Sequence, residues 1–201
     1  MKFFITALLL FSTLIFAQKK RNQLDVVSNI EAKVIAMKAI GNNTFTKDLL
    51  PFYGFAFGGN LMTPINFGVG IDYSELFSNI KPNRQNIYGN TGSPRITQID
   101  AFVTHRENIS EDFSVEEMAG FSFYRYTSIY IDQKDRKLKD EAVGFTLGGK
   151  AIYTLDGPQQ VFAAFKANFY FGGVYNENPE IKNYYSRSTF VSLSLGYRYN
   201  F

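Results

Sequence analysis

Apolar and polar residues alternate without a break at the end of the chain, over residues 191–201. Val191, Leu193, Leu195, Tyr197, Tyr199 and Phe201 share one face, and small or polar residues occupy the other. A period of two is typical of a β-strand with one apolar face. The same rhythm predicts seven earlier strands, so the total is eight. They cover residues 30–40, 53–61, 67–74, 98–104, 113–126, 143–155 and 161–172.

Two residues break this alternation. Phe162 falls on the polar face of its strand, and Glu117 falls on the apolar face. A carboxylate on an apolar face is typical of a local change of register, so we predict a β-bulge or a later strand start at Glu117.

The connections between these strands alternate in length. Residues 62–66, 106–112 and 156–160 form short connections, whereas residues 42–51, 78–95, 127–142 and 175–188 form longer ones that are rich in Asn, Lys, Asp and Tyr. Short turns at one end and long loops at the other indicate an up-and-down barrel. The predicted fold is all-β, an eight-stranded antiparallel barrel that spans a membrane, with both termini at the end that carries the short turns.

The first 17 residues predict a cleaved signal peptide. Lys2 is followed by an apolar run that ends at the small residue Ala17. This run is shorter than the roughly 20 apolar residues that a spanning helix needs. We therefore expect cleavage after Ala17, with residues 18–201 forming a single barrel domain.

The polar face indicates which side of the barrel faces inward. A soluble barrel that carries an apolar ligand also alternates, but it presents its polar face to water. Here that face is rich in Gly, Ser, Ala, Thr and Asn, which suits a narrow lumen better than a water-exposed surface. Its charges balance, four of each sign, and predict a buried ion-pair network. They are Glu31, Lys33, Asp72, Asp100, Glu116, Lys150, Lys166 and Arg198. For Glu31 and Arg198 a solvated position at a rim is an equal alternative.

Aromatic residues of the apolar face gather near the predicted strand ends. They are Tyr53, Tyr73, Tyr153, Tyr197, Tyr199 and Phe201. Such clustering is typical of the aromatic girdles of membrane barrels, although strands favour aromatic residues in general.

These features together resemble the small bacterial outer-membrane β-barrel family, which includes the OmpX-like and OmpA-barrel-like proteins. The most specific part of the resemblance is the end of the chain, where Tyr197, Tyr199 and Phe201 are similar to the terminal aromatic signal of such barrels. The resemblance implies location in the outer membrane of a Gram-negative cell, with outer-membrane lipid and lipopolysaccharide as surroundings. It also implies insertion by the outer-membrane barrel assembly machinery. It does not imply one activity, because members of the family differ in function.

Composition excludes several kinds of function. The net charge of +3 is too small to drive nucleic-acid binding. The absence of cysteine excludes disulfides, zinc–thiolate sites and cysteine catalysis. A metal site at Asp132, Asp135, Asp140 and Glu141 is disfavoured by the basic residues between them, and no cofactor is expected.

The sequence also gives no support to a catalytic function or to transport through an open pore. His105 is the one histidine, and the predicted topology places it at the end of the fourth strand that carries the short turns, so a Ser–His mechanism is disfavoured. Eight strands enclose a lumen just wide enough for side chains, and Tyr124 and Tyr170 add to the charged residues that fill it.

We therefore expect a non-enzymatic, monomeric outer-membrane barrel with a structural or surface-interaction role through four long extracellular loops. In the second loop Lys81, Arg84 and Arg95 occur without an acid and suit contact with lipopolysaccharide, or they form a plain solvated loop. The alternatives are a lipid A-modifying enzyme and a soluble periplasmic barrel that carries an apolar ligand.

Overall fold

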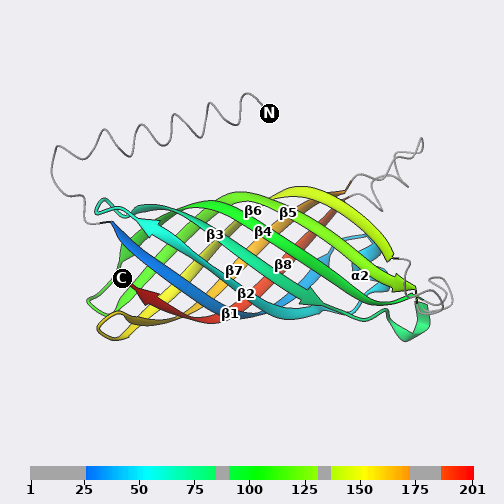
Figure 1. Cartoon of the computed structure of the whole chain (residues 1–201), viewed down its shortest axis with the longest axis horizontal. Coiled ribbons are helices and arrows are strands. Elements are labelled where there is room, and N and C mark those ends of the chain that lie inside the picture. The colour runs from blue at the N-terminus through cyan, green and yellow to red at the C-terminus, as the bar shows by residue number, and fades with distance from the viewer. Residues whose placement is uncertain (1–25, 85–90, 131–136, 173–186) are drawn as a thin grey trace, which may run out of the picture.

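The computed structural model describes residues 26–84, 91–130, 137–172 and 187–201. The predicted signal peptide, residues 1–17, lies outside them. Eight antiparallel strands follow one another around a closed barrel, and β8 pairs with β1 (Figure 1). The strands are β1 (Val27–Ile40), β2 (Phe52–Met62), β3 (Phe67–Phe77), β4 (Thr91–Asn108), β5 (Phe113–Tyr130), β6 (Lys137–Asp156), β7 (Gln159–Gly172) and β8 (Arg187–Asn200). The predicted fold is confirmed.

The two ends of the barrel differ. Asn29 of β1 pairs with Asn200 of β8, so the first and last strands begin and end at the same end of the barrel. This end also carries the short turns at residues 63–66, 109–112 and 157–158, and we call it the periplasmic end. The opposite, outer end carries the short helix α2 (Thr44–Asp48) and the one-turn 3-10 helix η2 (Pro82–Arg84) (Figure 1).

The apolar face of the strands forms the outside of the barrel. Along β7, inward and outward residues alternate between buried and exposed. Phe121 is 72% exposed, and Leu193 and Leu195 are each 65% exposed. An apolar surface that encircles a molecule in this way is far larger than the patches of soluble proteins and suits contact with lipid. The soluble carrier with an apolar interior is therefore wrong. In the described part of the chain, no helix is long and apolar enough to cross a membrane.

Several strands extend further than the sequence predicts. At the outer end β4 starts at Thr91, β5 continues to Tyr130 and β6 starts at Lys137, so much of the predicted connections 78–95 and 127–142 is strand. At the periplasmic end β4 continues to Asn108. These extensions carry polar side chains on both faces, so no alternation marks them, but neighbouring strands still pair through their backbones.

The bulge predicted at Glu117 is wrong. Glu117 pairs with His105 on one side and with Gly149 on the other in an unbroken register. Its side chain is exposed on the outer wall, in the part of β5 nearest to the periplasmic turn. The register shifts instead between Gly92 and Arg95 and between Thr154 and Asp156, close to strand ends.

Phe162 breaks the alternation because its ring lies inside the barrel. The neighbouring strand makes room for it with Gly196, which faces it across the β7–β8 pair. A Cβ atom at position 196 would lie 2.4 Å from Phe162 Cζ and 2.8 Å from the carbonyl oxygen of Ala32. Glycine is therefore required here by close packing rather than by its backbone angles.

Gly196→Ala is expected to lower the free energy of unfolding by about 1–3 kcal/mol, because overpacking forces side chains and backbone to shift. Urea unfolding of the purified protein in lipid vesicles measures this loss. Gly149→Ala is the matched control, because the nearest atom to its added Cβ, the Glu116 carbonyl oxygen, is 3.6 Å away. Equal effects of the two substitutions would contradict this account of Gly196.

Candidate functional site

A network of ion pairs fills the periplasmic half of the lumen. The structure brings together all eight charged residues that the alternation assigns to the polar face. Arg198 lies between Glu31 and Glu116, with Nη2 2.6 Å and 2.7 Å from their oxygens. Lys150 Nζ lies 2.7 Å from Glu31 Oε1 and 3.6 Å from Glu116 Oε2. Glu31 and Arg198 are both buried, so the alternative of solvated rim positions is wrong.

A second group of charges lies beside the first. Asp72 Oδ2 accepts hydrogen bonds from Lys33 Nζ at 2.5 Å and Lys166 Nζ at 2.7 Å. Lys166 Nζ also donates to Asp100 Oδ2 at 3.1 Å. Lys33 Nζ is 3.8 Å from Glu31 Oε2 and so joins the two groups. Each buried charge thus has an opposite charge within 4 Å, the condition under which ions are tolerated inside a protein.

The network contains one residue that the sequence pattern did not reveal. Arg106 Nη2 lies 2.6 Å from Glu116 Oε1 on the neighbouring strand. It was assigned to the connection 106–112, whereas β4 continues to Asn108. The alternation could have found it, since Arg106 follows the inward residues Phe102 and Thr104 at the same spacing.

Two inward aromatic rings complete this half of the lumen. The Phe162 ring centroid lies 4.9 Å from Lys150 Nζ and 5.9 Å from the Arg198 guanidinium carbon. The Phe102 ring lies 5.4 Å from Lys166 Nζ. A cation above an aromatic face is attracted by the ring quadrupole. These rings therefore fill space in the lumen and also interact favourably with the cations beside them.

The outer half of the lumen is closed by an aromatic lid. Helix α2 starts after Asn43, whose side chain accepts a hydrogen bond from the Thr46 amide. The helix inserts Phe45 among inward rings, with centroids 5.2 Å from Phe190, 5.3 Å from Tyr170 and 5.5 Å from Tyr126. Tyr124, expected to fill the lumen with Tyr170, is buried in the same cluster. The first long connection therefore folds into the barrel mouth.

The second connection holds this lid in place. Lys81 Nζ donates to the carbonyl oxygens of Thr46 and Lys47 at 2.7 Å and 3.1 Å. Arg84 Nε lies 3.4 Å from Asp48 Oδ1, and the backbones of Leu49 and Ile80 form a β-bridge. Arg95 is paired with Glu75 on the barrel wall. The three basic residues predicted to contact lipopolysaccharide as one free loop are thus engaged within the protein.

Among the described residues, the ion-pair network occupies one half of the barrel centre and the aromatic lid occupies the other. Within the described residues, no group of three His, Asp or Glu side chains is placed to hold a metal ion. Asp140 accepts a hydrogen bond from Tyr170 and Glu141 pairs with Lys139, while Asp132 and Asp135 lie outside the described residues.

No protein-family model matches the chain, and no curated protein matches it in sequence. Solved structures, however, share its architecture. Neisserial surface protein A aligns with a TM-score of 0.62 at 15% identity, over 87% of this chain and 97% of that one. A major outer membrane protein of Thermus thermophilus aligns with a TM-score of 0.61 at 12% identity, over 87% and 99%. Ail of Yersinia pestis, in complex with the heparin analogue sucrose octasulfate, aligns with a TM-score of 0.58 at 10% identity, over 89% and 100%. The chain has the fold of a small bacterial outer-membrane β-barrel.

The outer wall of this outer-membrane barrel carries aromatic residues near both ends. Tyr153, Tyr197, Tyr199 and Phe201 are exposed at the periplasmic end, and Tyr53 is exposed towards the outer end. Tyr199 and Phe201 contact each other, with centroids 5.2 Å apart. This placement agrees with interfacial girdles. Recognition of Tyr197, Tyr199 and Phe201 by the assembly machinery stays a prediction.

His105 lies on the outer wall of the barrel. Its ring is 4.7 Å from the ring of Phe67, near the periplasmic end of β4. A mechanism in which histidine activates serine requires both side chains at one site, with the histidine oriented by a third group. The ring contact of His105 is with Phe67, and within the described residues no hydrogen bond joins His105 to a serine.

Proposed function

We propose that this outer-membrane barrel is a non-enzymatic surface-interaction protein that acts through its outer end. The observation that carries the proposal is the doubly closed lumen. With an ion-pair network below and the Phe45 lid above, the protein's own side chains occupy the interior of the described barrel, so we place recognition at the outer surface.

The composition of the outer connections supports this role. The segment 175–188 contains Tyr175, Tyr184 and Tyr185 with several asparagines, and Tyr88 and Asn90 lie in the segment 78–95. Tyrosine and asparagine are the residues that antibody loops use for recognition, because they provide a large rigid contact and adaptable hydrogen bonds. We assign the partner contact to the parts of these two segments and of 127–142 that lie beyond the strands, because the first connection is used as the lid.

Whole cells that produce the protein test the proposal. Immobilised heparin is a suitable probe, because Ail forms a complex with a heparin analogue. We expect producing cells to adhere more than cells without the protein, and replacement of residues 175–185 by a Gly/Ser sequence of equal length to remove the difference. Replacement of the short turn 109–112 in the same way is the matched control and should leave adhesion unchanged.

Two measurements on the purified protein would contradict the proposal. Steady ion conductance across a planar bilayer would indicate a pore, and release of acyl chains from lipid A would indicate an enzyme. We expect neither activity from the intact chain.

A further inference from the structure

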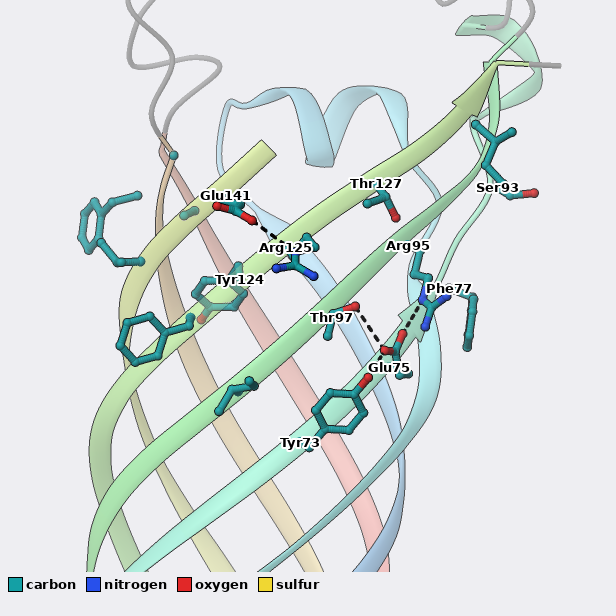
Figure 2. Close-up of a pocket in the computed structure, with 17 residues that line it drawn as sticks. Tyr73, Glu75, Phe77, Ser93, Arg95, Thr97, Tyr124, Arg125, Thr127 and Glu141 are labelled. Atoms are coloured by element: carbon teal, nitrogen blue, oxygen red, sulfur yellow. Dashed lines mark hydrogen bonds and ion pairs between the residues drawn. The ribbon is translucent and has the colours of Figure 1, made fainter. Parts of the chain in front are cut away.

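A polar cluster lies on the outer wall, where the strands leave the apolar belt. Glu75 of β3 accepts hydrogen bonds from Tyr73 Oη, Thr97 Oγ1 and Arg95 Nε (Figure 2). Two strands further around the barrel, Arg125 Nε and Lys139 Nζ lie 3.2 Å and 2.7 Å from Glu141 Oε1. A charged residue on the lipid side of a barrel costs about 2–4 kcal/mol at the bilayer midplane and close to nothing near an interface. This cluster therefore marks the outer interface of the membrane.

A groove of about 1020 Å³ runs beneath and between these charges, across the outer faces of β3 to β7 (Figure 2). Its charged side is formed by Glu75, Arg95, Arg125 and Glu141. Its apolar side is formed by Ile99, Phe123, Val143 and Phe171, which belong to the lipid-facing belt. The register aligns these four across adjacent strands, since Ile99 pairs with Phe123, Phe123 with Val143 and Val143 with Phe171. The groove is thus amphipathic along the direction of the membrane normal.

The charges of the groove favour an anion. The lining itself carries two cations, Arg95 and Arg125, and two carboxylates, Glu75 and Glu141. Lys139, which pairs with Glu141 just outside the lining, gives the cluster one net positive charge. Each arginine uses Nε for its carboxylate, and each of the two arginine side chains remains about half exposed. The terminal nitrogens of a guanidinium form a planar fork that matches phosphate oxygens. Glu75 and Glu141 hold the two guanidinium groups in place at the edge of the groove.

We propose that this groove binds one phosphorylated lipid of the outer leaflet. Its phosphate contacts Arg95 and Arg125, and one acyl chain lies along Ile99, Phe123, Val143 and Phe171. The site lies on the barrel wall, at the level of the membrane, and not on the outer loops. It therefore goes beyond the proposed surface role and does not depend on which partner the loops contact.

Binding of lipid A to the purified, detergent-solubilised full-length barrel tests the site, with native mass spectrometry to count bound lipids. Diacylglycerol of matched chain length, which has no phosphate, and inorganic phosphate are compared under the same conditions. We expect lipid A to bind at least tenfold more tightly than diacylglycerol. We also expect the double substitution Arg95→Gln/Arg125→Gln to weaken lipid A binding at least tenfold.

Two further variants separate recognition from loss of folding. Glu141→Gln keeps a side-chain oxygen that can accept a hydrogen bond from Arg125 Nε and removes one negative charge. It should therefore tighten lipid A binding, a direction that damage to the fold would not produce. Lys38→Gln removes an exposed cation from β1, outside the groove, and should leave binding unchanged. Equal binding of lipid A and diacylglycerol, unchanged binding by the double variant, or displacement of lipid A by millimolar inorganic phosphate would each overturn the proposal.

Discussion

Arg198→Met is expected to lower the free energy of unfolding by about 3–5 kcal/mol, the loss associated with removal of one partner from a buried ion pair. The Arg198 guanidinium donates to both Glu31 and Glu116 and is fully buried. Methionine retains much of the volume but removes the one cation that contacts both carboxylates closely, so that Glu116 keeps only Arg106 and Glu31 only Lys150 within 3 Å. Urea unfolding in lipid vesicles, followed by the mobility of unheated samples in electrophoresis, measures the loss.

Arg125→Met is the matched control for this experiment. Arg125 also pairs with a glutamate across neighbouring strands, but both side chains are more than half exposed on the outer wall. Exposed ion pairs contribute about 0–1 kcal/mol. If Arg198→Met and Arg125→Met destabilise the barrel equally, the lumen network does not hold the strands together in the way described.

Phe45→Ala is expected to open the lid without unfolding the barrel. Truncation of a buried phenylalanine costs about 3–5 kcal/mol, and here the loss falls on the segment 41–51, because the ring packs among Tyr126, Tyr170 and Phe190 of the barrel. A loss of that size corresponds to proteolysis faster by roughly a hundred- to several thousandfold when opening is rapid. Limited proteolysis of the native protein, with the cleavage site mapped to 41–51, measures it.

Phe45→Leu provides the control, because leucine still fills part of the aromatic cluster and should raise the cleavage rate far less. Conductance should stay absent in Phe45→Ala, since Arg198, Lys150 and their partners close the lumen below the lid. Unchanged proteolysis in Phe45→Ala would mean that the ring does not hold the lid in the barrel mouth.

The faces of the strands could be predicted from the sequence because burial in a barrel alternates with a period of two. This is why Glu31, Asp72 and Lys150, far apart in the chain, were assigned to one lumen. Their individual pairs could not be predicted, because they depend on how eight strands align around the barrel. Lys150 meets Glu31 across 119 residues of sequence.

The sequence did not predict those parts of the structure in which apolar and polar residues do not alternate. Where β4 and β5 rise beyond the apolar belt, their outer face carries polar residues such as Arg95, Thr97 and Arg125, so the strand extensions and the pairing of Arg95 with Glu75 left no trace in the pattern. The lid is a second case. Phe45 is the one apolar residue among the polar residues 42–48, and its burial depends on a mouth lined by Tyr170 and Phe190 from distant strands.

The central claim is that the apolar face meets lipid while the polar face lines a closed lumen. The chain contains no tryptophan, so single substitutions give clean fluorescent reporters. Phe123 and Tyr124 are neighbours in β5 at nearly the same height, and the first is 57% exposed whereas the second is 2% exposed. In vesicles with lipids brominated near the upper acyl chain, the account predicts strong quenching of Phe123→Trp and weak quenching of Tyr124→Trp. Weak quenching of Phe123→Trp with water-exposed emission, or stronger quenching of Tyr124→Trp, would contradict it.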